Sequence, residues 1–182
     1  MADTTKTLFL GGARSGKSRL AQGAAERYPG PLHYLATAEA FDDEMTARID
    51  RHRDDRGPRW RTVECPIALP QAVAACREGA ILIDCLTLWL SNLMLGDHPV
   101  DAHTRDLLDA LAATPLPVMI VSNEVGMGIV PEHPLGRAFR DEAGRLNQAV
   151  AASVDTTYLV VAGLVLPLMR IDTNGTFPLA AP

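Results

Sequence analysis

The sequence predicts an α/β fold, and three observations support this prediction. Short apolar, β-branched runs alternate with segments of helical spacing along most of the chain, as in a parallel sheet with helices on both faces. The 182 residues, 47% of them hydrophobic, suit one domain spanning residues 1–182. The first apolar run leads into the pattern G-x-x-x-x-G-K-[ST], whose residues are Gly11, Gly12, Ala13, Arg14, Ser15, Gly16, Lys17 and Ser18. Together these features indicate a mostly parallel sheet of the P-loop NTPase type.

The elements follow from the change of periodicity along the chain. Apolar runs predict strands at Thr7–Leu10, Leu32–Ala36, Arg61–Glu64, Ala80–Cys85, Val118–Ser122 and Thr157–Val161. Apolar residues at helical spacing predict helices at Lys17–Arg27, Asp42–Arg53, Leu69–Arg77, Leu86–Leu95, Ala102–Ala113 and Arg137–Val154. Gly96–Val100 is expected to be a surface loop, and residues 171–182, with one glycine and two prolines, a loosely attached tail.

The phosphate-binding pattern specifies its own chemistry. Its glycines let backbone N–H groups converge on phosphate oxygens, and Lys17 adds a positive charge for the terminal phosphates. The Ser18 hydroxyl is a ligand for Mg²⁺. Because a helix is expected to begin at Lys17, its N-terminal dipole also favours an anion. The sequence therefore predicts a nucleoside triphosphate site.

Other polar residues follow the predicted strands and belong at the same edge of the sheet. Asp84 ends an apolar strand, where a carboxylate either holds Mg²⁺ or caps the next helix. Thr37 and Asn123-Glu124 follow two further strands, and the glycines after Glu124 either admit a ligand or form a plain loop. Glu124 occupies the position of the lysine in the guanine-reading pattern N-K-x-D, which argues against a regulatory GTPase.

Composition excludes several classes of function. The net charge of -5, without a cluster of Lys and Arg, is unlike a nucleic-acid-binding protein. The sequence shows neither a signal peptide nor an apolar run of membrane-spanning length, so a cytoplasmic protein is expected. Cys65, Cys76 and Cys85 are odd in number and lack C-x-x-C spacing, so we expect free, buried thiols.

A charged segment between the second and third strands is the unusual part of the chain. It carries His52 with Arg48, Arg53 and Arg56. A neutral imidazole is a competent nucleophile towards phosphorus, and arginines orient phosphates, although a histidine here also fits a structural role. Glu64 is either a contact for a ribose or base, or simply an exposed charge.

Two further pairs of polar residues are not assigned to the predicted site. Arg137 and Asp141 are four residues apart on a predicted helix and are expected to form an exposed ion pair, with phosphate binding as the alternative. His98 and His103 are expected to lie too far apart to form a metal site.

Several of these segments together closely resemble the family of bifunctional adenosylcobinamide kinases/adenosylcobinamide-phosphate guanylyltransferases of cobalamin biosynthesis. The resemblance covers residues 7–165 in order and with compatible spacing. The segments that carry it are Gly11–Ser18, Tyr34–Ala38, Asp42–Met45 with Arg48, Ile49 and His52, Trp60–Glu64, Ser122–Pro131 and Phe139–Gln148.

The resemblance implies a P-loop fold, a homotrimer and two consecutive reactions. ATP or GTP, with Mg²⁺, phosphorylates adenosylcobinamide, and GTP then donates GMP through a guanylylated histidine that falls on His52. The implied nucleotide contacts, beyond residues 11–18, fall on Ala36, Thr37, Ala38, Arg53, Asp54, Asp55, Arg56, Glu64 and Asp84. The alternatives are a P-loop kinase for a small metabolite, in which His52 is structural, and a regulatory ATPase with a protein partner.

Overall fold

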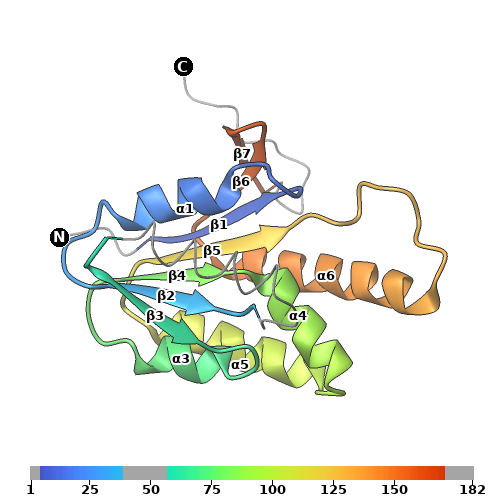
Figure 1. The fold of residues 1–182 in the computed structure, drawn as a ribbon, viewed down its shortest axis with the longest axis horizontal. Coiled ribbons are helices and arrows are strands. Elements are labelled where there is room, and N and C mark those ends of the chain that lie inside the picture. The colour runs from blue at the N-terminus through green and yellow to red at the C-terminus, as the bar shows by residue number, and fades with distance from the viewer. Residues whose placement is uncertain (1–4, 39–56, 171–182) are drawn as a thin grey trace.

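The computed structural model describes residues 5–38 and 57–170. These residues form alternating strands and helices, shown in chain order in Figure 1. The elements are β1 (Lys6–Gly11), α1 (Lys17–Ala25), β2 (Leu32–Ala36), β3 (Trp60–Glu64), α3 (Leu69–Ala75), β4 (Ala80–Asp84), α4 (Leu86–Leu95), α5 (Val100–Ala113), β5 (Val118–Asn123), α6 (Pro134–Ser153), β6 (Thr156–Val161) and β7 (Leu164–Leu168).

The strands form a seven-stranded sheet in the order β3-β2-β4-β5-β1-β6-β7. Every pairing is parallel except that of β7, which runs antiparallel to β6. β5 therefore lies between β1 and β4. The register places the strand ends together, since Gly11 pairs with Asn123 and Ala36 pairs with both Asp84 and Glu64.

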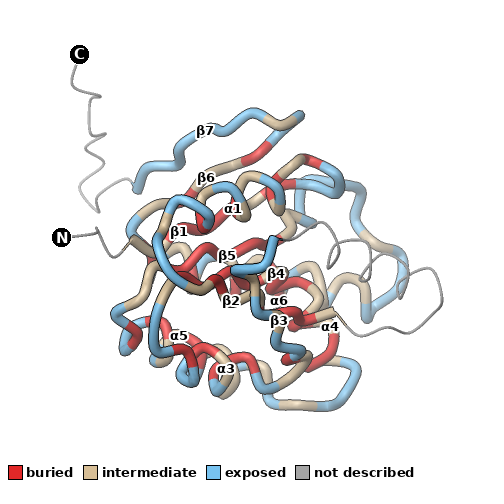
Figure 2. Tube along the Cα trace, turned by 60° about the vertical axis from the view of Figure 1, so that its left-hand side comes forward, coloured by how far each residue is buried: buried red, intermediate tan, exposed pale blue. Residues whose placement is uncertain are grey.

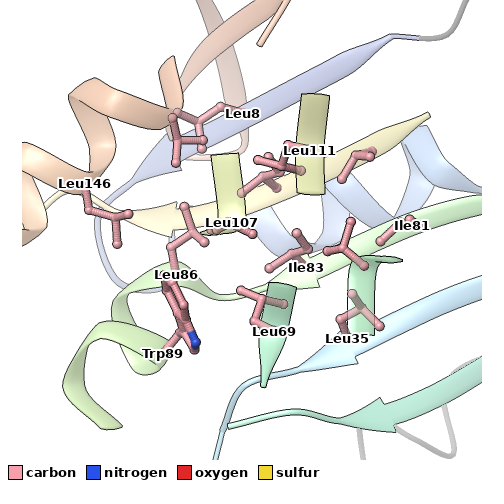
Figure 3. Packing of buried hydrophobic residues seen from close by; sticks show 14 of the residues in the cluster. Leu8, Leu35, Leu69, Ile81, Ile83, Leu86, Trp89, Leu107, Leu111 and Leu146 are labelled. Carbon is pink, nitrogen blue, oxygen red and sulfur yellow. The ribbon is translucent and has the colours of Figure 1, made fainter. Parts of the chain in front are cut away.

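Helices cover both faces of the sheet, as the sequence predicts. α1 lies on one face, while α3, α4, α5 and α6 lie on the other (Figure 1). Side chains alternate between the faces, so that Ile81 and Ile83 join the larger core cluster and Leu82 joins the smaller. The larger cluster unites the sheet with these helices through Trp89, Leu107, Leu146 and their neighbours (Figure 3).

Most predicted elements are confirmed to within about three residues. α6 begins at Pro134 rather than Arg137, because proline's fixed φ suits the first turn of a helix. α5 begins at Val100, inside the predicted loop. The predicted helix Asp42–Arg53 and the predicted tail lie outside the described residues. No described helix is long and apolar enough to span a membrane.

β7 was missing from the sequence prediction. It is exposed along its whole length, whereas buried residues concentrate in the central strands (Figure 2). Its turn contains Ala162 (φ 52°) and Gly163 (φ 78°), and two successive residues of positive φ are typical of a two-residue hairpin. Gly163 between two apolar runs was the available signal, and an alanine before it is an uncommon choice for this turn.

Candidate functional site

The phosphate loop joins β1 to α1 and has the backbone that its sequence predicts. Arg14 (φ 57°) and Gly16 (φ 96°) adopt the left-handed conformation that turns the chain into the helix. Lys17 is 7% exposed, and its Nζ donates a hydrogen bond to the carbonyl oxygen of Gly12 at 3.0 Å. The lysine charge is therefore held against the loop, close to the N-terminus of α1.

The loop contains an unsatisfied polar group. Ser15 is 8% exposed, and its Oγ has no hydrogen-bond partner among the described residues. A buried hydroxyl without a partner costs about 1–3 kcal/mol, so it favours a ligand that supplies an acceptor or donor. The loop lines a pocket of about 500 Å³ whose walls are Arg14, Ser15, Gly16, Lys17, Ser18, Arg19, Ala162 and Gly163.

The turn between β6 and β7 supports the phosphate loop from the side. The Gly163 N–H donates to the Ser15 carbonyl oxygen at 2.8 Å. A Cβ at Gly11 would lie 2.4 Å from the Val160 carbonyl oxygen and 2.7 Å from Ser15 Oγ, so only glycine fits there. The turn that leads into the unpredicted strand β7 is thus part of the wall of this pocket.

Asp84 lies at the end of β4, half-buried, where its Oδ2 accepts a hydrogen bond of 3.1 Å from the Tyr34 hydroxyl. The pKa of the neighbouring Cys85 thiol depends on the charges around it. Burial raises the pKa of its thiol, the Asp84 carboxylate raises it further, and the Lys17 ammonium lowers it. The Lys17 ammonium and the Asp84 carboxylate therefore both lie within electrostatic range of the Cys85 thiol.

Thr37 is fully buried and joins three elements. Its Oγ1 donates to the Cys85 carbonyl oxygen at 2.7 Å and accepts from the Cys85 N–H at 2.8 Å. Asn92 Nδ2 donates to the Thr37 carbonyl oxygen at 2.8 Å. The side chain thus fastens β2 to β4, and its predicted contact with nucleotide stays a prediction. Ala36 and the half-buried Ala38 flank it at the same edge.

The end of β3 places Glu64 at this edge too, exposed and paired in register with Ala36. Its position is compatible with a contact to a ribose or base, and that role stays a prediction. His52 and the adjacent Arg53, Asp54, Asp55 and Arg56 lie outside the described residues.

Side-chain amides at the end of β5 form hydrogen bonds with α4 and α6. Asn123 Nδ2 donates to Thr87 Oγ1 at 2.6 Å, and Asn147 Nδ2 donates to the Asn123 carbonyl oxygen at 3.1 Å. The Glu124 N–H donates to the Gly11 carbonyl oxygen at 3.1 Å. This network fixes the start of the following loop against the phosphate loop.

The predicted ion pair between Arg137 and Asp141 is wrong. Arg137 instead donates to the carbonyl oxygens of Pro131 and Glu132, at 3.0 and 2.5 Å, because it lies in the first turn of α6 beside the preceding loop. Asp141 pairs with the adjacent Arg140 at 2.8 Å. Arg145 pairs with Glu142 at 2.8 Å.

The histidine and cysteine predictions had different outcomes. The rings of His98 and His103 lie 5.6 Å apart, closer than expected, because α5 begins early and shortens the loop between them. Even so, no group of three potential metal ligands occurs in the described part of the chain. The thiols of Cys65, Cys76 and Cys85 are free and buried, as predicted, and burial raises the pKa of Cys65 to about 12.

Comparisons with known proteins agree on one family. The family model described as cobinamide kinase / cobinamide phosphate guanyltransferase matches residues 7–168, which includes β7. A bifunctional adenosylcobalamin biosynthesis protein CobP of Pseudomonas aeruginosa is 46% identical, over 90% of this chain and 96% of the relative. The protein CobU of Salmonella typhimurium is 42% identical, over 86% and 96%.

Solved structures add support for the fold alone. A protein of Pyrococcus horikoshii superposes with a TM-score of 0.51 at 6% identity, covering 94% of this chain and 89% of the other. This chain covers 96% of the length of each of the two relatives. The chain therefore belongs to the cobinamide kinase / cobinamide phosphate guanyltransferase family.

Proposed function

We propose that this protein phosphorylates adenosylcobinamide with ATP or GTP and then transfers GMP from GTP to the resulting phosphate. The products of the second reaction are adenosylcobinamide-GDP and pyrophosphate. The observation that carries the proposal is the phosphate loop, with its enclosed Lys17 and unpartnered Ser15 hydroxyl, in a chain of this family. In the first reaction a substrate hydroxyl oxygen attacks the γ-phosphorus and its proton passes to solvent, while the bond to the bridging oxygen breaks and the nucleoside diphosphate leaves with that electron pair.

The loop residues stabilise the charge that moves between phosphates. Lys17 places an ammonium group at the terminal phosphates in both reactions, and the N–H groups at the start of α1 add a fixed positive potential. The buried Ser15 hydroxyl offers a hydrogen bond that no group of residues 5–38 and 57–170 uses. Because these groups are held in place beforehand, they need little rearrangement as the transition state forms.

Ser18 and Asp84 fit Mg²⁺ by the chemistry of their donors. Mg²⁺ prefers hard oxygen ligands and typically combines one or two protein groups with phosphate oxygens. When bound, the ion neutralises phosphate charge. Tyr34 orients the Asp84 carboxylate through its hydroxyl, and the residues of the loop hold the phosphates that complete the site.

For the second reaction we propose His52 as the nucleophile. Its ring nitrogen forms a bond to the α-phosphorus, the bond to the bridging oxygen breaks, and pyrophosphate leaves with that electron pair. A phosphate oxygen of the corrinoid then attacks the same phosphorus, and the phosphorus–nitrogen bond breaks to restore the histidine. Support comes from the sequence, which places Arg48, Arg53 and Arg56 beside His52 to offset repulsion between phosphates.

Product analysis tests the proposed function. Purified protein with Mg²⁺, ATP and adenosylcobinamide should yield the corrinoid phosphate, and later addition of GTP should yield adenosylcobinamide-GDP with one pyrophosphate per transfer. The rival small-metabolite kinase would release no corrinoid-dependent pyrophosphate. A regulatory ATPase would hydrolyse ATP at a rate independent of the corrinoid.

The remaining assignments rest on the resemblance and on position at the sheet edge. We propose that Glu64 and residues 36–38 contact the nucleotide, with Arg53, Asp54, Asp55 and Arg56 on the adjoining segment. Glu64→Gln should then raise the KM for GTP and leave the KM for the corrinoid unchanged. The homotrimer is proposed on the resemblance alone, and sedimentation at micromolar protein concentration tests it.

A further inference from the structure

The loop between β5 and α6, residues 124–133, exposes a run of apolar side chains. Met127 is 80% exposed and Ile129 is 98% exposed, with Val130 exposed beside them. No charged residue occurs from position 125 to 131. Isolated exposed apolar residues are ordinary, but a contiguous set on one loop is typical of a binding surface.

Charged side chains at both ends hold this loop in shape. The Glu124 carboxylate accepts hydrogen bonds from the N–H groups of Gly126 and Met127, at 2.8 and 3.1 Å. At the other end, Arg137 donates to the carbonyl oxygens of Pro131 and Glu132. Fixed ends reduce the conformational entropy that binding has to remove, so the loop presents its apolar side chains ready for a ligand.

The loop also begins at the phosphate site. Its first residue, Glu124, donates its N–H to the Gly11 carbonyl oxygen, and Asn123 pairs in register with Gly11. From there the loop extends outward past the carboxyl end of β5 before the chain enters α6 (Figure 1). Figure 2 shows it as a largely exposed stretch. A substrate whose hydroxyl reaches the phosphate loop would have its remaining bulk beyond this edge.

We propose that the β5–α6 loop binds the apolar ring edge of the corrinoid substrate, with Met127 and Ile129 as its main contacts. This inference rests on the proposed function. A corrinoid ring with its methyl groups and amide arms is larger than the phosphate pocket, whose volume is about 500 Å³. The substrate therefore needs a second binding surface that is continuous with the pocket. The loop supplies apolar side chains, and its exposed backbone supplies partners for amides.

The exposed strand β7 is a weaker candidate for this role. It runs antiparallel, so Leu168 pairs with Thr157 at the start of β6, and its apolar side chains lead away from the carboxyl edge. The other possible occupant of the β5–α6 loop is a second copy of this chain, which the experiment distinguishes by mass.

The experiment compares the double variant Met127→Ser/Ile129→Ser with Leu95→Ser. Leu95 is 66% exposed at the end of α4, outside the loop, and controls for the loss of exposed apolar area. The measurements are equilibrium dialysis of adenosylcobinamide without nucleotide, kinase KM values for corrinoid and ATP, the midpoint of thermal unfolding, and mass by light scattering. The substituted side chains are exposed, so the thermal midpoint should not change.

The expected result is a rise of about tenfold or more in the dissociation constant and KM for the corrinoid in the double variant, because two apolar contacts are lost. The KM for ATP, the mass and all values for Leu95→Ser should stay within about twofold of wild type. Corrinoid binding unchanged in the double variant would overturn the inference. A lower mass with unchanged corrinoid binding would overturn it too, and would assign the loop to contacts between copies.

The dialysis separates this inference from the proposed function. Wild-type protein that binds the corrinoid through the loop without phosphorylating it would contradict the kinase proposal and keep the loop assignment. Equal binding and phosphorylation of the corrinoid by the wild-type protein and the double variant would contradict only the loop assignment. Absence of both binding and phosphorylation would contradict both.

Discussion

The two sides of β1 differ in what they contribute to the site. On the side of β5 and β4, parallel strands end in polar side chains that are held by hydrogen bonds: Asn123 bonds to Thr87, and Asp84 bonds to Tyr34. On the side of β6 and β7, the antiparallel hairpin brings backbone atoms against the phosphate loop, namely the Val160 carbonyl oxygen and the Gly163 N–H.

The β5–β4 side therefore supplies functional groups, and the β6–β7 side holds the phosphate loop in its conformation. Substitutions on the β5–β4 side remove functional groups and should change rates or metal dependence while the fold survives. Substitutions on the β6–β7 side disturb the packing of the hairpin backbone against the backbone of the phosphate loop. They should therefore change the stability of the fold together with nucleotide binding. The phosphate loop lies between these two sides. Some substitutions in it should change reaction rates, and others should change stability and nucleotide binding.

The largest expected effect is that of Lys17→Ala. Both reactions should slow by about a hundredfold or more, equivalent to about 2.7 kcal/mol in each transition state, because the phosphates lose the positive charge of the Lys17 ammonium. Initial rates of corrinoid phosphorylation and of pyrophosphate release measure this. If only one rate falls, the two reactions do not share the phosphate loop.

Gly11→Ala tests the support side. The new Cβ would lie 2.4 Å from the Val160 carbonyl oxygen, so the loop or β6 has to shift, at a cost of about 1–3 kcal/mol of unfolding free energy. Denaturant unfolding measures the loss, and the KM for nucleotide should rise with it. Gly12→Ala is the matched control, since apart from its chain neighbours no atom of the described residues lies within 4 Å of a Cβ there. Equal stability of the two variants would contradict the close packing of β6 on the loop.

Asp84→Asn tests the chemical side. The Mg²⁺ concentration for half-maximal activity should rise about tenfold, about 1.4 kcal/mol, because a charged oxygen ligand becomes neutral. The unfolding free energy should change little, since the half-buried amide keeps the shape of the carboxylate. Unchanged Mg²⁺ dependence in a titration of either reaction would show that Asp84 does not hold the ion; it does not cap α4, whose N-cap is Cys85 without a side-chain hydrogen bond.

Tyr34→Phe should have the smallest effect of this series. It removes the 3.1 Å hydrogen bond to Asp84 Oδ2 and leaves the ring in place, which costs about 0.5–1.5 kcal/mol. We expect a shift of a few-fold in Mg²⁺ half-saturation, in the same direction as Asp84→Asn but smaller. A normal Mg²⁺ titration, or a shift that adds fully to that of Asp84→Asn in the double variant, would show that Tyr34 does not act through the carboxylate.

Sequence reasoning was most successful where a local pattern determines local structure. The phosphate loop and the strands β1, β4 and β5 could be predicted because buried parallel strands are continuous apolar runs with defined ends. The Thr37–Cys85 hydrogen bonds and the contact of Gly163 with Ser15 could not, because they join residues far apart in the sequence. The Arg137 prediction was wrong because spacing on a helix does not account for carbonyl groups in the preceding loop.

The most direct test of the account uses GTP labelled at the α-phosphate. The account predicts that label stays on the wild-type protein after denaturation, is released by acid and survives alkali, as a phosphorus–nitrogen bond requires. His52→Ala should carry no label and should still phosphorylate adenosylcobinamide at a substantial rate. Normal formation of adenosylcobinamide-GDP by His52→Ala would contradict the account, because GMP transfer would then not pass through His52.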